Sequence, residues 1–83
     1  MSSGKVVFIN QSTDWYVVQI KEHGYLLFET DVADIDLGDL ISGDFGTRGV
    51  KVKFRNITRR KEFDVFIVDN FLSRENLRKL YGF

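Results

Sequence analysis

The chain has 83 residues, 43% of them hydrophobic, and its 12 basic and 12 acidic side chains give a formal net charge of zero at pH 7. This length allows one domain, residues 1–83, and the composition excludes an intrinsically disordered chain. The absence of cysteine excludes disulfides and thiolate metal sites, and it favours a reducing, cytoplasmic location.

Three short strands are predicted in the first third of the chain. The first spans Gly4 to Asn10 and the second spans Trp15 to Lys21, and both are rich in β-branched and aromatic residues. A turn-forming polar run separates them. A short turn over residues 22–24 leads into the third strand, Tyr25 to Glu29. The close spacing predicts an antiparallel meander.

The middle of the chain is acidic and is predicted to hold a connection and a fourth strand. Asp31 to Asp36 is too short and too acidic for a free-standing helix, so we expect a connection there. Leu37 to Phe45 is predicted to be the fourth strand, with Gly43 as a bulge or twist point.

The fifth predicted strand has cationic outward side chains. From Gly49 to Arg55 apolar residues and cations alternate strictly. The two-residue period of a strand directs Val50, Val52 and Phe54 toward the core and the cations toward solvent. Seven cations and no carboxylate lie between Arg48 and Lys61.

A sixth strand and a helix complete the predicted elements. Glu62 to Asp69 is rich in Phe, Val and Ile, and we expect it to form a hairpin with the fifth strand. Ser73 then predicts a helix N-cap, and Gly82 predicts the helix end. Between them lies an apolar stripe at three- and four-residue spacing: Leu77, Leu80 and Tyr81. A helix this short must dock its stripe on the sheet to be stable.

Five or six short strands punctuated by glycines, with one terminal helix, favour a barrel over a sandwich, which usually needs about seven strands. The predicted fold is therefore mainly β: a small OB-like antiparallel barrel of five to six strands with a short C-terminal helix.

The first 58 residues also resemble a cold-shock domain. GKVVFIN at Gly4 to Asn10 is similar to that family's opening strand, and DWYVVQI and YLLFE, at residues 14–20 and 25–29, stand at its two RNA-binding motifs. Gly38-Asp39, Arg48-Gly49 and Asn56-Ile57-Thr58 match the flanks of its fourth and fifth strands. The resemblance implies an OB barrel over residues 4–58, to which residues 59–83 add a strand and a helix.

The resemblance further implies a face that binds single-stranded RNA or DNA. In cold-shock domains, outward aromatic side chains stack on successive bases, and Phe8 and Trp15 keep an aromatic at such positions. Val17 and Leu27 replace aromatics, and Glu29 replaces a histidine. Two stacking groups remain, and one anion has been added.

The residues themselves indicate the same candidate site. Trp15 and Tyr16 are adjacent on a strand and point to opposite sides, so one of them lies outside the core. If Phe8, Trp15 and Tyr25 share one outward side, they form a platform for bases, while cations contact the phosphates. The candidate nucleic-acid-binding residues are Phe8, Trp15, Tyr25, Lys51, Lys53, Arg55, Arg59, Arg60 and Lys61.

The alternative hypothesis is a protein-interaction or adaptor barrel. In that case Trp15 lies under the chain's own helix, under a partner chain or in a self-associated dimer. The neutral net charge and the aliphatic residues Val17 and Leu27 favour this interpretation. Charged residues along a strand are also a common way to keep a sheet edge soluble. The acidic run from Glu29 to Asp44 is then a set of solvated charges or a patch for a basic partner.

No catalytic site, cofactor or metal is predicted. His23 is the only histidine, and it lies in no serine or cysteine context typical of a catalytic triad. The aspartates lack the spacing of a calcium loop, and the scattered glycines form no phosphate-binding loop. No apolar run approaches the length of a membrane span. We therefore expect a non-enzymatic binding module with no membrane association.

Overall fold

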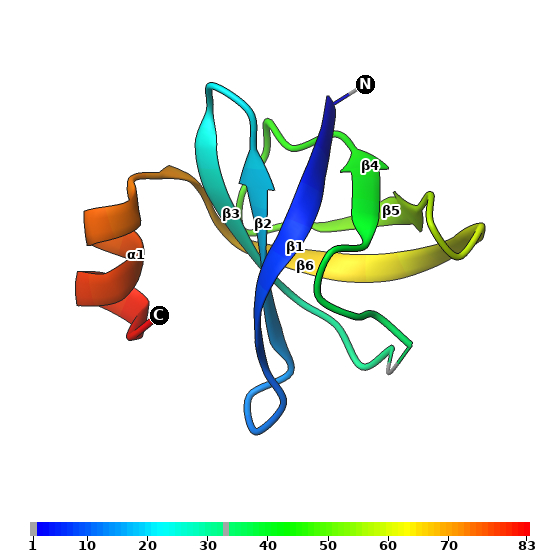
Figure 1. Cartoon of the computed structure of the whole chain (residues 1–83), viewed down its shortest axis with the longest axis horizontal. Coiled ribbons are helices and arrows are strands. Elements are labelled where there is room, and N and C mark those ends of the chain that lie inside the picture. Colours follow the sequence, from blue (N-terminus) through cyan, green and yellow to red (C-terminus); the bar gives the residue numbers. More distant parts are fainter. Residues whose placement is uncertain (1, 33) are drawn as a thin grey trace.

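The structure, a computed structural model, describes residues 2–32 and 34–83, and within them it forms a closed barrel with one helix at its side (Figure 1). The elements are β1 (Ser2–Asn10), β2 (Trp15–Ile20), β3 (Gly24–Glu29), β4 (Leu40–Gly43), β5 (Lys51–Asn56), β6 (Lys61–Leu72) and α1 (Arg74–Tyr81). The predicted fold class is confirmed for this part of the chain: a mainly β, closed antiparallel barrel of six strands with a short C-terminal helix. The arrangement is consistent with an OB-like barrel.

Two antiparallel meanders joined along two seams make up the barrel. β1, β2 and β3 form the first meander, as predicted, and β4, β5 and β6 form the second. Along one seam β1 pairs with β4, with Lys5 opposite Leu40. Along the other seam β3 pairs with β6, with Glu29 opposite Phe66. Both seams are antiparallel, so the sheet closes on itself.

Aromatic side chains fill the inside of the barrel. Phe28 is fully buried, with its ring stacked on Tyr16 at 5.5 Å and edge-on to Phe54 at 5.4 Å between ring centroids. Tyr16 is therefore the inward member of the pair that it forms with Trp15. Phe54 is 1% exposed, which confirms the inward side of the alternating β5 strand. Val50 precedes β5 and is 41% exposed, so it does not share this inward position.

The strand β4 is shorter than the predicted strand from Leu37 to Phe45. Residues 37 and 38 form a turn instead, because the side-chain carboxylate of Asp39 accepts a hydrogen bond of 3.0 Å from the backbone amide of Asp36. Gly43 is regularly paired rather than bulged. A Cβ atom there would lie 2.5 Å from Cδ1 of Phe54, so this glycine makes room for a core ring.

The strand β6 ends three residues later than predicted, at Leu72. Along the seam with β3, Leu27 lies opposite Asp69 and Tyr25 lies opposite Leu72, so β6 holds one more residue than its partner in this interval. An extra residue on one strand of an antiparallel pair is a β-bulge, which bends the strand that carries it. Phe71 lies in this bulge and has a φ of +54°.

The helix α1 has the predicted caps at both ends. The hydroxyl of Ser73 accepts a hydrogen bond of 3.0 Å from the amide of Asn76, which satisfies a free donor of the first turn. Gly82 has a φ of +80°, and its amide donates to the carbonyl of Arg78 at 2.9 Å. The helix therefore has two turns, and Ser73 alone separates it from the end of β6.

Candidate binding face

The outward side chains of β1, β2 and β3 form an apolar cluster separate from the barrel core. We call this surface the outer face, and its residues are Val7, Phe8, Trp15, Val17, Tyr25 and Leu27. The structure thus brings Phe8, Trp15 and Tyr25 to one side of the sheet, which is the condition that a stacking platform requires. All three are half-buried rather than open. The indole Nε1 of Trp15 also donates a hydrogen bond of 3.3 Å to the carboxylate of Glu29.

The helix α1 covers the outer face (Figure 1). Leu77 is fully buried, and it belongs to one cluster with Val17 and Leu27, which are also fully buried. Val17 and Leu27 are the two positions at which the cold-shock resemblance places aromatics. The helix packs on these two aliphatic side chains through Leu77. Trp15 therefore lies under the chain's own helix, which is one of the coverings that the alternative hypothesis names for this residue.

Side chains of the C-terminal segment pack against Trp15 and Phe8, the two positions at which this chain has an aromatic residue as cold-shock domains do. Tyr81 meets Trp15 edge-on, with 5.6 Å between ring centroids, and Phe83 meets Phe8 at 5.9 Å. The guanidinium carbon of Arg74 lies 4.8 Å from the centroid of the Phe8 ring, in cation–π geometry. Two aromatic rings and a guanidinium from the chain itself therefore take places that bases would need.

Only one edge of α1 docks on the barrel. Leu77 and Tyr81, which are one turn apart, contact the outer face, whereas Leu80 is 63% exposed. The prediction that Leu80 belongs to the docked stripe is therefore wrong. The helix contacts the outer face along the line of Leu77 and Tyr81, four residues apart, and Leu80 lies on its solvent side.

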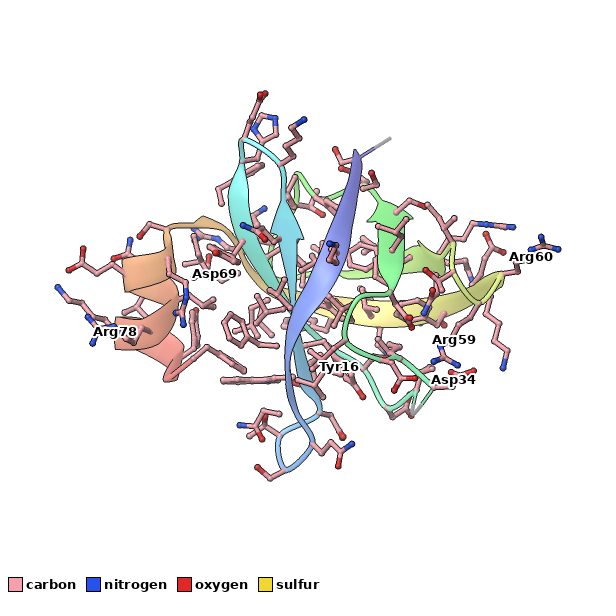
Figure 2. The ribbon with its side chains drawn as sticks, in the orientation of Figure 1. Tyr16, Asp34, Arg59, Arg60, Asp69 and Arg78 are labelled. Atoms are coloured by element: carbon pink, nitrogen blue, oxygen red, sulfur yellow. The ribbon has the colours of Figure 1, made fainter. Side chains whose placement is uncertain are left out.

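A buried carboxylate connects the last turn of α1 to β6. Asp69 accepts hydrogen bonds from the hydroxyl of Tyr81 at 2.8 Å, from the guanidinium of Arg48 at 3.2 Å and from the amide of Asn70 at 2.9 Å. Burial by itself raises the pKa of Asp69, but these three hydrogen bonds outweigh it and hold the pKa below its usual value. Burial and the hydrogen bond to Asp69 raise the pKa of Tyr81. Figure 2 shows Asp69 on the side of the barrel that faces α1.

The cations of the β5–β6 turn lie far from α1 and are largely paired. Figure 2 shows Arg59 at the opposite end of the molecule from the helix. Arg59 forms ion pairs with Asp36 and Asp39, and Nζ of Lys61 lies 2.5 Å from Oδ2 of Asp34. The hydrogen bond from Lys61 lowers the pKa of Asp34. The acidic connection and the cationic turn are thus joined to each other rather than forming two separate patches.

Asp39 fixes this junction. Its carboxylate, only 6% exposed, accepts hydrogen bonds of 2.9 Å from Asn56 and from Nε of Arg59, in addition to the bond from the Asp36 amide. Burial raises the pKa of Asp39, but these hydrogen bonds outweigh it and lower the pKa. The role that these contacts give to Arg59 is to hold the acidic connection against the barrel.

Across the β5–β6 hairpin, the outward cations of β5 face acidic or aromatic residues of β6. Lys53 lies opposite Asp64 with 3.3 Å between the charged atoms, Arg55 lies opposite Glu62, and Lys51 lies opposite Phe66. The surface of the hairpin therefore carries alternating charges rather than a single row of cations. Sequence reasoning missed this pairing, although the register of the predicted hairpin contains the signal, because KFR at 53–55 meets EFD at 62–64.

The predicted site thus separates into two regions. Phe8, Trp15 and Tyr25 lie together beneath α1. The cations lie on β5, on the turn that follows it and at the first residue of β6, and the aromatic cluster includes none of them. Within the described part of the chain, three candidate cations form no ion pair: Lys51, Arg55 and Arg60. All three are exposed.

Neither the described residues nor known proteins assign a chemistry to the chain. Over residues 2–32 and 34–83, no group of three or more His, Asp or Glu side chains is placed to hold a metal ion. No helix in that part is long and apolar enough to cross a membrane. Comparisons with models of protein families, with curated proteins and with solved structures found no match.

Proposed function

We propose that the chain is a non-enzymatic protein-interaction module, an adaptor barrel whose outer face receives a short amphipathic helix. One observation carries the proposal: the chain's own α1 lies on the outer face, with Leu77 packed on Val17 and Leu27 and with Tyr81 packed on Trp15. OB-type barrels bind both proteins and nucleic acids, so the residues of the face decide between the two uses.

The outer face has the features of a helix-binding groove. In that mode of recognition an apolar face takes anchors from one side of a helix at spacings of three, four and seven residues. Leu77 and Tyr81 are such a pair, and Phe83 adds a third anchor beyond the helix end. The balanced charges of the β5–β6 hairpin also support a protein partner, because they reduce the attraction for phosphates.

The proposal can be tested with the segment itself as the ligand. A fluorescent peptide of residues 73–83 is titrated into a Leu77→Ala chain, whose own helix is weakened, and anisotropy is measured. The same peptide with Leu77→Ala serves as the control ligand. We expect saturable binding of the first peptide and at least tenfold weaker binding of the second, since a buried leucine is lost.

A parallel titration separates this function from its main competitor. Labelled single-stranded RNA and DNA are added to the unaltered chain at low salt, and we expect no binding at tens of micromolar. Oligonucleotide binding in the absence of peptide binding would contradict the adaptor function and favour the second candidate.

The second candidate function is weak binding of single-stranded RNA or DNA by a cold-shock-like OB barrel in the cytoplasm. One observation favours it: the Phe8 ring already contacts an aromatic ring, tilted by 41°, and a guanidinium that lies over its face. Bases that displaced Tyr81 and Phe83 would find the same surfaces of Trp15 and Phe8. In this candidate Tyr25 extends the platform. The cations Lys51, Lys53, Arg55, Arg59, Arg60 and Lys61 steer the phosphates.

A further inference from the structure

We propose that α1 is exchanged between two copies of this chain, so that the helix of each copy docks on the outer face of the other in a domain-swapped dimer. The proposal rests on the proposed function, because it names a second copy as the partner that supplies the helix. Three observations lead to it: the length of the junction before α1, the backbone conformation of Phe71, and the contacts that α1 makes.

The junction between the barrel and α1 is short and bent. β6 ends at Leu72, and Ser73 alone separates it from the first helical residue, Arg74. The β-bulge immediately before Leu72 redirects β6, and the chain then returns across the outer face. The position of α1 on its own barrel therefore depends on the backbone of the bulge.

Phe71 holds this bulge in an unfavourable conformation. Its φ of +54° is in the left-handed region, which a bulky side chain rarely adopts. In the common bulge of this kind the left-handed residue is glycine. Among the described residues, the other non-glycine positions with positive φ are Asp14, Glu22 and Arg60, and all three lie in tight turns.

Packing does not account for the conformation of Phe71. Its ring is 57% exposed, so the side chain is not held in place by the barrel core. The bend instead brings Leu72 inward, where it is 6% exposed and joins the cluster of Leu77. The strain at Phe71 thus belongs to the closed junction that places α1 on its own barrel.

Opening the junction removes the strain without losing the helix contacts. If Phe71 adopts an extended φ, β6 continues straight and α1 leaves its own barrel. On a second copy the same helix finds the same partners, with Leu77 on Val17 and Leu27 and Tyr81 on Trp15. Short, strained hinge connections are the usual origin of such exchange.

The exchange is detected directly by mixing labelled and unlabelled chains. Isotope-filtered NOE spectra of a mixture of ¹³C-labelled and unlabelled protein report contacts between copies. We expect a dimer that forms with rising concentration in sedimentation equilibrium. We also expect intermolecular NOEs between the rings of Trp15 and Tyr81, which lie 5.6 Å apart between centroids.

Substitutions of Phe71 test the role of the hinge. Phe71→Gly and Phe71→Ala both remove the ring, but only glycine relieves a positive φ. For a non-glycine residue, the left-handed conformation is disfavoured relative to an extended one by about tenfold in the equilibrium constant. With two junctions in the dimer, Phe71→Gly is therefore expected to raise its dissociation constant about a hundredfold relative to Phe71→Ala. Phe71→Val, which is β-branched and tolerates the left-handed region least, is expected to tighten the dimer.

Two results would overturn the proposal. One is that the unaltered chain and the Phe71→Val chain both remain monomeric up to millimolar concentration. The other is a dimer in which every NOE between Trp15 and Tyr81 is intramolecular. In either case, binding of the 73–83 peptide would still support the proposed function, whereas loss of peptide binding would contradict both.

Discussion

The hydroxyl of Tyr81 donates a hydrogen bond of 2.8 Å to Oδ2 of Asp69, and this bond joins the last turn of α1 to the end of β6. The same carboxylate holds the guanidinium of Arg48, which precedes β5. One buried charge therefore connects the helix, the longest strand and a loop. Docking of α1 should depend on whether that carboxyl group is ionised.

Acid should weaken helix docking through Asp69. The pKa of Asp69 is lowered in the folded chain, so its stabilisation is present above the unfolded value of about 4 and is lost as the pH falls through the lower folded value. The free energy of unfolding, measured in urea at several pH values, should therefore fall below about pH 4. Asp69→Asn should reduce this pH dependence and leave the remaining part to Asp34 and Asp39, whose pKa values are also lowered. Asp64→Asn, which alters an exposed pair, is the control. An identical slope in the Asp69→Asn chain would contradict the prediction.

Two leucines of α1 should differ sharply in their contribution to stability. Leu77 is fully buried, so Leu77→Ala should lower the free energy of unfolding by about 2 to 5 kcal/mol. Leu80 is 63% exposed, so Leu80→Ala should change it by no more than about 0.5 kcal/mol. Urea unfolding followed by Trp15 fluorescence measures both. Equal effects would show that α1 docks through a different edge.

The centre of the barrel should not tolerate loss of Phe54. This residue is 1% exposed and packs its ring against Phe28 and Phe45, at 5.4 and 5.1 Å between centroids. Phe54→Ala should cost about 3 to 5 kcal/mol, which is enough to unfold a domain of this size. Phe66→Ala on the neighbouring strand, at a site 40% exposed, is the matched control. A melting temperature near that of the unaltered chain would contradict the inward assignment of Phe54.

If single-stranded RNA or DNA binds to the chain, charge and stacking should affect its affinity in separable ways. Lys51, Arg55 and Arg60 are the candidate cations without an ion pair in the described chain. Three phosphate contacts predict a slope of log affinity against log salt of about minus 2. Replacing the three cations with alanine should flatten this slope. Trp15→Ala should weaken binding at every salt concentration and leave the slope unchanged. Arg59 is left intact, because its loss would release Asp39. An unaltered slope in the triple variant would exclude these cations as phosphate contacts.

Local patterns in the sequence were enough to predict the six strands, the first meander and the hairpin of the last two strands. Alternation placed Phe54 inside, and the glycine and polar turns separated the strands. The end of β6 was not predictable in the same way, because Asn70, which follows the predicted end at Asp69, is a polar residue typical of a turn. Asn70 stays in the strand because its side-chain amide donates to the carbonyls of Phe45 and Thr47, and both are remote from it in sequence.

The candidate site was predicted in its parts but not in its assembly. Phe8, Trp15 and Tyr25 lie on one side of the sheet, which the sequence supported only as a condition. Strict alternation from the core residue Val6 would turn Phe8 inward, and the register shift between Val6 and Phe8 brings it to the outer side. Whether α1 covers them depends on the direction in which the chain leaves β6, and that direction is set by a bulge at Phe71. A phenylalanine carries no local signal for such a bend, because the residue expected there is glycine.

The seam between β3 and β6 has a consequence for synthesis of the chain. The first three strands to leave the ribosome carry apolar side chains on both sides, with Phe28 facing inward and Leu27 facing outward. β6 covers the inward side when it closes the barrel, and α1 covers the outward side only after that. Nascent chains should therefore expose a sheet with apolar side chains on both surfaces until β6 and α1 have emerged, which is the kind of intermediate that is prone to aggregation.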